Sequence, residues 1–168
     1  LMTKKGELRG GVISRTYYAV IIIASTLTPL HGLNAVEING KLIHAVGFVE
    51  SNNNPNAMGD SGAANGSFQM HRPSWSDCSA WLKSQGFKAT PYEQGVNDPT
   101  VSHYYCKIYL SLLHRQLARA LDREITAGDL YAAYNLGFTG YKRRGFDLSK
   151  CPSITQRAVA KLNRKLGE

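Results

Sequence analysis

A single acidic residue stands where an apolar segment gives way to a polar loop. Glu50 follows residues that recur at steps of three and four, the spacing of one buried helix face. These apolar residues are Ile38, Leu42, Ala45, Val46 and Val49. A carboxyl held against such a face loses hydration of its charged form, so its pKa rises. A carboxyl that stays protonated can donate a proton to a leaving oxygen, which makes Glu50 a candidate general acid.

The segment after Glu50 has the composition of a binding loop. Pro55 prevents the preceding helix from continuing, while Gly59, Gly62 and Gly66 permit positive φ angles and a close approach of the backbone to a ligand. We therefore expect a helix from Val36 to about Glu50, followed by a loop to Gln69 with a short hairpin around residues 62–68.

Three motifs then stand in order along the chain. Glu-Ser-Asn-Asn-Asn-Pro-Asn-Ala begins at Glu50, Gly-Ser-Phe-Gln ends at Gln69, and Ala-Ala-Tyr-Asn-Leu-Gly spans 132–137. Together they resemble the motifs of the lytic transglycosylases related to goose-type lysozyme, the family with the soluble-lytic-transglycosylase domain. Asp98-Pro99 and the later Tyr-Leu-Ser-Leu-Leu at 109–113 resemble a helix of that family, so the resemblance covers roughly residues 36–145.

The resemblance implies an activity and a set of site residues. Glu50 would protonate the oxygen between N-acetylmuramic acid and N-acetylglucosamine, then act as base toward the C6 hydroxyl of the muramic acid. The product would be a 1,6-anhydro sugar, formed without a cofactor. Ser51 and Gln69 match the family's substrate-side polar positions, and Tyr134 and Asn135 match its pair facing the glutamate and the sugar N-acetyl groups.

The chain also departs from the family pattern. Gly-Ser-Phe-Gln replaces the usual Gly-Leu-Met-Gln, Ser102-His103 replaces Asn-Ile, and Phe138-Thr139 replaces Pro-Gly. These differences concern packing and the wall of the cleft, so they bear on subsite preference more than on the reaction.

Two other functions fit the same residues. A hydrolytic muramidase would need a second carboxylate across the cleft to activate water, and Asp60 and Asp77 are the nearest downstream acids. Asp60, between Gly59 and Ser61, has the setting of a turn residue. A non-catalytic glycan-binding envelope protein would keep the fold without the chemistry.

Length and charge restrict the partners. With 168 residues and a formal net charge of +8, the chain is long enough for one domain with a hydrophobic core and carries a basic surface that favours polyanions. It shows no nucleic-acid-binding motif, so we expect no specific nucleic-acid partner. The anionic bacterial envelope agrees with the motifs, and glycan strands of peptidoglycan are the expected partner.

The N-terminal segment has the layout of an export signal. Basic residues up to Arg15 precede an uncharged run from Thr16 to Val36, then Pro29 breaks it and Ala35 offers a cleavage point. The alternative is an uncleaved membrane anchor over residues 16–36. We therefore divide the chain into 1–35, a signal peptide or anchor, and 36–168, a lysozyme-like domain in the periplasm or cell envelope. Secretion, conjugation, phage assembly and wall turnover all remain open as its setting.

The remaining pattern predicts a mainly α-helical domain. We expect helices from Pro73 to Gly86, from Pro99 to about Leu121 with Asn97 or Asp98 as the N-cap, from a Thr126–Asp129 capping box to Gly137, and from Pro152 to about Leu166.

Cysteines and histidines add no second chemistry. The 3 cysteines, Cys78, Cys106 and Cys151, allow at most one intramolecular disulfide, with three pairings open. The 5 histidines have no metal-binding spacing, so we expect no metal site. His71, close to Gln69, is a weaker candidate for sugar contact.

Overall fold

The computed structural model describes residues 36–167, and these residues are mainly helical. The α-helices are α1 (Gly40–Ser51), α2 (Arg72–Ser84), α3 (Tyr92–Gly95), α4 (Pro99–Ala118), α5 (Ala127–Lys142) and α6 (Ser153–Leu166). Two short 3-10 helices, η1 (Asp60–Gly62) and η2 (Leu148–Lys150), and two strands, β1 (Met58–Gly59) and β2 (Ala64–Asn65), complete the elements. The predicted signal or anchor segment, residues 1–35, lies outside the described residues. Within 36–167, no helix combines the length and apolarity needed to cross a bilayer.

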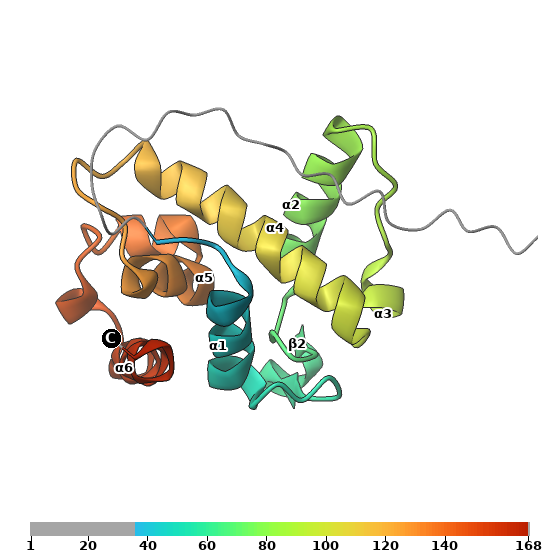
Figure 1. Ribbon diagram of the computed structural model, residues 1–168, viewed down its shortest axis with the longest axis horizontal. Coiled ribbons are helices and arrows are strands. Elements are labelled where there is room, and N and C mark those ends of the chain that lie inside the picture. Colours follow the sequence, from blue (N-terminus) through green and yellow to red (C-terminus); the bar gives the residue numbers. More distant parts are fainter. Residues whose placement is uncertain (1–35, 168) are drawn as a thin grey trace, which may run out of the picture. The chain divides into compact units, whose positions relative to one another are not determined.

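The long helix α4 lies at the centre of the arrangement. It packs against α2 on one side and α5 on the other, and α1 and α6 pack together beside α5 (Figure 1). The side chains of Leu110 and Leu117 on α4, Leu130 on α5 and Leu162 on α6 are fully buried and belong to a single core cluster. Burial of this apolar surface is the main stabilising contribution to the fold.

Local sequence signals set the starts of α4 and α5 as predicted. The Asp98 carboxylate accepts hydrogen bonds from the backbone N–H groups of Thr100 and Val101 at 2.8 and 2.9 Å, with Pro99 as the first helical residue. At α5, the Thr126 hydroxyl accepts from Asp129 N, and the Asp129 carboxylate accepts from Thr126 N, both at 3.0 Å. The predicted capping box is therefore confirmed.

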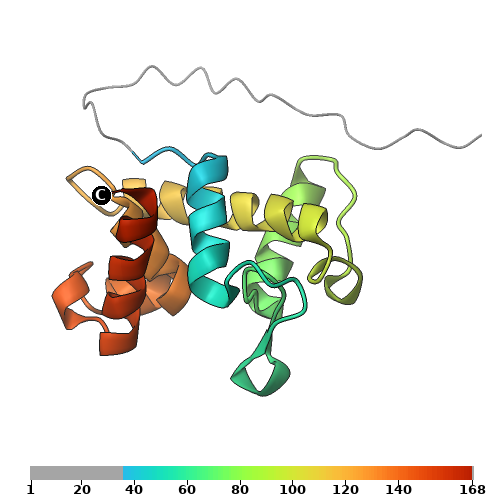
Figure 2. The same ribbon diagram turned by 60° about the horizontal axis from the view of Figure 1, so that its bottom comes forward.

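The structure corrects two boundaries near Glu50. Helix α1 begins at Gly40 rather than Val36, because the Asn39 side chain accepts a hydrogen bond from Leu42 N at 3.0 Å and caps the helix there. The hairpin is also displaced, since Met58 pairs with Asn65 and Gly59 with Ala64, with η1 at the turn. Figure 2 shows this hairpin projecting beyond the helices from the region that follows α1.

Gly137 interrupts α5 but does not end it. Its φ of 69° and ψ of 154° are not helical, so the predicted break at this glycine is present. Helical geometry nevertheless resumes after Gly137 and continues to Lys142. The continuation buries Tyr141 completely and brings its hydroxyl to the Asp129 carboxylate at 2.7 Å. This tertiary contact explains the longer helix, and the local sequence pattern does not predict it.

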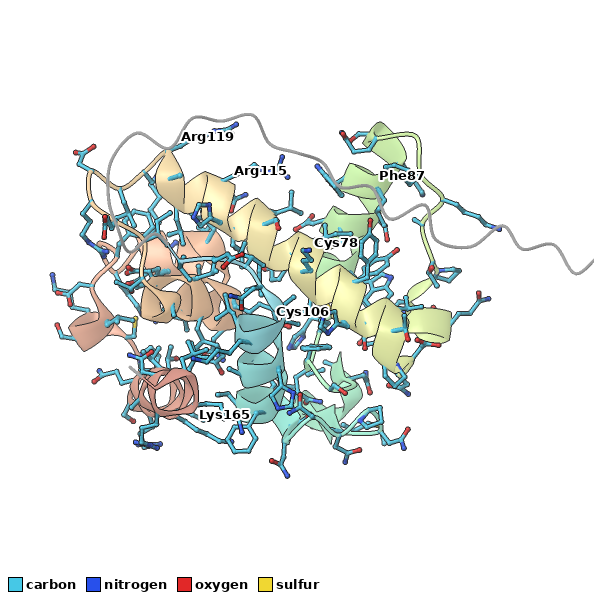
Figure 3. All side chains as sticks on the ribbon, viewed as in Figure 1. Cys78, Phe87, Cys106, Arg115, Arg119 and Lys165 are labelled. Carbon is cyan, nitrogen blue, oxygen red and sulfur yellow. The ribbon has the colours of Figure 1, made fainter. Side chains whose placement is uncertain are left out.

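All three cysteines are buried free thiols. Cys78 lies on α2 and Cys106 on α4, where these two helices pack together (Figure 3). Burial raises the pKa of the Cys78 thiol to about 12. The described residues therefore contain no disulfide, and the thiols contribute to the core.

Candidate functional site

Glu50 lies on the last turn of α1, at the end of the helix's buried face. Val46 and Leu42 occupy the same face one and two turns earlier, respectively, and are almost fully buried. The helix ends at Ser51, and the next residue, Asn52, caps it. Asn52 adopts a left-handed conformation with φ 58°, and its N–H donates to the Phe48 carbonyl at 3.1 Å. Glu50 itself is half-buried. The predicted placement of an acid against apolar surroundings is therefore observed.

The Glu50 carboxyl receives a hydrogen bond from α5. The hydroxyl of Tyr131, a residue with only 2% of its surface exposed, donates to Oε1 of Glu50 at 2.8 Å. Burial raises the pKa of Glu50 to about 7, and the nearby charge of Asp60 acts in the same direction, while the Tyr131 hydrogen bond and the charge of Lys161 oppose it. A carboxyl with this pKa is present in both protonation states at neutral pH, which suits transfer of a proton in either direction.

Tyr134 lies on the same face of α5, three residues after Tyr131. Its hydroxyl donates to the backbone carbonyl of Phe68 at 2.6 Å, so it supports the loop that precedes Gln69. The rings of Tyr131 and Tyr134 are 6.3 Å apart between centroids. Burial raises the pKa of both hydroxyls above the usual value for tyrosine, which keeps them protonated as hydrogen-bond donors. Tyr131 therefore makes the contact to Glu50 that the motif resemblance assigned to Tyr134.

Ser51 and Gln69 shape the loop between α1 and α2. The Ser51 hydroxyl donates to the Ser67 carbonyl at 2.7 Å and accepts from Asn54 N at 3.0 Å. The Gln69 amide nitrogen donates to the carbonyls of Gly66 and Ala57 at 2.9 and 3.2 Å. Both side chains thus hold the loop in place beside Glu50, and substrate contact remains a prediction for each of them.

Glycine is required at position 66 because the backbone there passes close to the backbone of Val96. The φ of Gly66 is 75°, and a Cβ atom there would lie 2.1 Å from the carbonyl oxygen of Val96. Only glycine fits both the left-handed backbone and the lack of space. The glycine therefore fixes where the loop passes the segment before α4.

Asn135 points to a different neighbour. It is exposed, and its Oδ1 accepts a hydrogen bond from the buried hydroxyl of Thr155 on α6 at 2.8 Å. The residue stands one position after Tyr134 on α5, so it connects α5 to the start of α6. The structure records no bond between Asn135 and Glu50 in the described part of the chain.

The two other carboxylates named from the sequence lie on different elements, Asp60 on the hairpin and Asp77 on α2. Asp60 is exposed and its carboxylate lies 3.1 Å from Nε2 of His71, which joins η1 to the start of α2. The negative charge of Asp60 reaches Glu50, as the direction of its effect on the Glu50 pKa indicates. Asp77 is an exposed residue of α2. Of these two carboxylates, Asp60 is the one whose charge is among the causes that raise the Glu50 pKa.

Two surface hollows lie elsewhere. One, of about 360 Å³, is lined in part by Arg123, Asp129 and Tyr141, and the other, of about 340 Å³, in part by Arg72, Trp75 and Tyr92. In the first, Asp129 is held by Arg123 through two bonds of 2.6 and 2.8 Å. The Asp129 carboxylate already accepts hydrogen bonds from protein groups, so we assign this acid in the hollow a structural role. Glu50 lines neither of these two hollows.

Sequence reasoning missed two residues that contact Glu50 or the backbone just before it, Tyr131 and Lys161. A usable signal existed for Tyr131, since residues three apart on a helix share a face and Tyr134 was already selected. Lys161 had no such signal, because it is 113 positions from Phe48, the backbone group it contacts. A resemblance based on motifs cannot identify a contact made by a residue outside those motifs.

Comparison with models of known protein families, with curated proteins and with solved structures gave no match.

Proposed function

We propose that this chain is a peptidoglycan lytic transglycosylase that cleaves the β-1,4 bond between N-acetylmuramic acid and N-acetylglucosamine. The observation that supports it best is the half-buried Glu50 carboxyl, with a pKa raised to about 7 and a hydrogen bond from Tyr131 at 2.8 Å. The motif resemblance supplies the substrate class. The proposed place of action is the periplasm or cell envelope.

The proposed reaction needs one carboxyl. Protonated Glu50 donates its proton to the glycosidic oxygen as the bond from C1 of the muramic acid to that oxygen breaks, leaving an oxocarbenium-like centre. The C6 hydroxyl of the same sugar then forms a bond to C1, and the Glu50 carboxylate accepts the hydroxyl proton. No water is consumed, and Glu50 returns to its starting state. The attacking hydroxyl is tethered to the reacting sugar, which reduces the entropic cost of the step.

Tyr131 orients the acid in this scheme. Its hydroxyl donates to Oε1, so the hydrogen bond becomes stronger when Glu50 is ionised after the first proton transfer. The other carboxyl oxygen, Oε2, remains the candidate atom for proton transfer. Tyr134 and Ser51 act one step further away, by holding the carbonyls of Phe68 and Ser67 in the neighbouring loop.

Product analysis of digested cell walls tests the proposal. Purified sacculi are incubated with the wild-type protein and with the Glu50→Gln variant, and released muropeptides are separated and weighed by mass spectrometry. We expect fragments lighter by one water than the corresponding reducing-ended fragments, and none from the variant. Equal release by the two proteins would remove Glu50 from the mechanism.

A hydrolytic muramidase is the second candidate, because Asp60 is close enough to Glu50 for its charge to raise the Glu50 pKa. In this reaction Asp60 would activate a water molecule, and the products would have reducing ends. Reducing ends that disappear in an Asp60→Asn variant would favour hydrolysis. Binding of the wild-type protein to sacculi without release of any fragment would instead indicate a non-catalytic glycan-binding protein.

A further inference from the structure

Lys161 of α6 contacts the end of the helix that carries Glu50. Its Nζ donates a hydrogen bond to the carbonyl of Phe48 at 3.0 Å and lies 3.4 Å from that of Val49. The same ammonium group lies 4.5 Å from the centroid of the Phe48 ring. Lys161 is half-buried, and its contacts fall on the two residues that immediately precede Glu50.

The Phe48 carbonyl already accepts a hydrogen bond from Asn52 N at 3.1 Å, so Lys161 is its second donor. The carbonyls at the end of a helix carry partial negative charge. At the end of α1 this charge disfavours ionisation of a carboxyl on the last turn. A lysine that donates to those carbonyls offsets their charge and fixes the backbone that carries the carboxyl. Helix α1 has no basic residue of its own in its last turn, so the cation comes from α6.

We infer that Lys161 is a positioning residue for Glu50, holding the last turn of α1 against α6 and placing a positive charge beside the carboxyl. The kinetic part of this inference rests on the proposed function. Its electrostatic part concerns the Glu50 carboxyl itself and can be measured whether or not the protein cleaves a glycan.

Several titratable groups lie near the carboxyl, and the charge of Lys161 acts against burial and against the charge of Asp60. The groups are Tyr131 and Tyr134 of α5, Cys106 of α4, Asp60 of η1 and Lys161 of α6. Burial has the largest effect and raises the Glu50 pKa, and the charge of Asp60 raises it further. The charge of Lys161 lowers it. Lys161 therefore keeps the acid from becoming too weak to give up its proton near neutral pH.

Lys165, one turn later on α6, is a matched control. Its ammonium also lies 4.5 Å from the centroid of the Phe48 ring, and the residue is exposed (Figure 3). Within the described residues, no hydrogen bond joins Lys165 to a carbonyl of α1. Replacing Lys165 therefore removes the same charge and the same kind of contact with the Phe48 ring as replacing Lys161. It leaves the hydrogen bonds to the carbonyls at the end of α1 intact.

The test compares the variants Lys161→Met, Lys161→Arg and Lys165→Met with the wild type. The pKa of Glu50 is measured by carbon-13 NMR of its carboxyl, in the protein alone. For Lys161→Met we expect the pKa to rise by about 0.5 to 1 unit, because an opposite charge is lost. Lys161→Arg should stay close to the wild type, and Lys165→Met should move by less than about 0.2 unit because its charge is screened by solvent.

The activity readout uses the same proteins on purified cell walls. The high-pH limb of the lysis profile should move up with the Glu50 pKa in Lys161→Met, and kcat should fall about tenfold because the carboxyl is less well oriented. Thermal unfolding checks that each variant is folded, and Lys161→Gln replaces the methionine variant if that one is not. An unchanged Glu50 pKa in the folded Lys161→Met or Lys161→Gln variant, or an equal shift in Lys165→Met, would overturn the inference. A shifted pKa in a protein with no lytic activity would retain it and reject the proposed function.

Discussion

The hydroxyl of Tyr131 and the carboxyl of Glu50 meet at 2.8 Å, across 81 positions of the chain. This hydrogen bond connects the middle of α5 with the last turn of α1. It lowers the pKa of Glu50, whereas burial, the larger effect, raises it. The balance between these effects leaves the pKa of Glu50 at about 7.

Tyr131→Phe tests this relationship. Loss of the hydroxyl should raise the pKa of Glu50 further, move the high-pH limb of cell-wall lysis upward and reduce kcat about tenfold, because the ionised carboxyl loses a donor. The measurements are a pH–rate profile and the carboxyl titration by NMR. Tyr104→Phe, at an exposed residue of α4, is the control and should behave as the wild type. Identical profiles for the two variants would contradict a role for the Tyr131 hydroxyl.

Glu50→Gln should change how stability depends on pH. Because the pKa of Glu50 is higher in the folded chain than its ordinary value, the folded state binds this proton more tightly than the unfolded state. The stability linked to the proton is fully present below the ordinary pKa and is lost as pH rises to about 7. The variant lacks this loss, so its free energy of unfolding relative to wild type should increase by about 3 kcal/mol between pH 4 and pH 8.

Urea titrations at a series of pH values measure this difference. A difference that stays constant over the same range would mean that Glu50 ionises as freely in the folded chain as in water. Glu124→Gln, at an exposed glutamate before α5, is the matched control and should show no such trend.

Asp129→Asn should destabilise the fold. Burial opposes ionisation of Asp129, but hydrogen bonds from Arg123, Tyr141 and Thr126 outweigh it and lower the pKa to about 2. The stabilisation is present above the ordinary pKa of an aspartate and is lost as pH falls toward 2. We expect a loss of about 2 kcal/mol at pH 7 and a much smaller loss at pH 2, measured by chemical unfolding. A loss that does not depend on pH would assign the effect to packing.

Gly66→Ala and Gly62→Ala separate backbone conformation from space. Both glycines have positive φ, 75° and 91°, but a Cβ at Gly66 would lie 2.1 Å from the Val96 carbonyl, whereas at Gly62 nothing lies within 4 Å. We expect about 1 kcal/mol of destabilisation at Gly62 and about 3 kcal/mol or more at Gly66. Thermal unfolding of both variants measures the difference, and comparable losses would show that the loop moves away from Val96 without cost.

The local features of this protein follow from interactions between residues that are close in the chain. The Asp98-Pro99 start of α4 and the Thr126–Asp129 capping box follow from hydrogen bonds between residues a few positions apart, so they could be read directly. The apolar spacing before Glu50 also predicted a buried helix face with the acid at its end, because helical periodicity is a local property.

The groups that meet at Glu50 come from helices far apart in the chain, so the sequence pattern did not identify them. Tyr131 on α5 and Lys161 on α6 reach α1 because three helices pack together, and packing depends on the complementary shapes of faces far apart in the chain. The continuation of α5 past Gly137 has the same origin, since Tyr141 gains a buried partner in Asp129. Local patterns therefore located the acid, and long-range packing set its surroundings and its pKa.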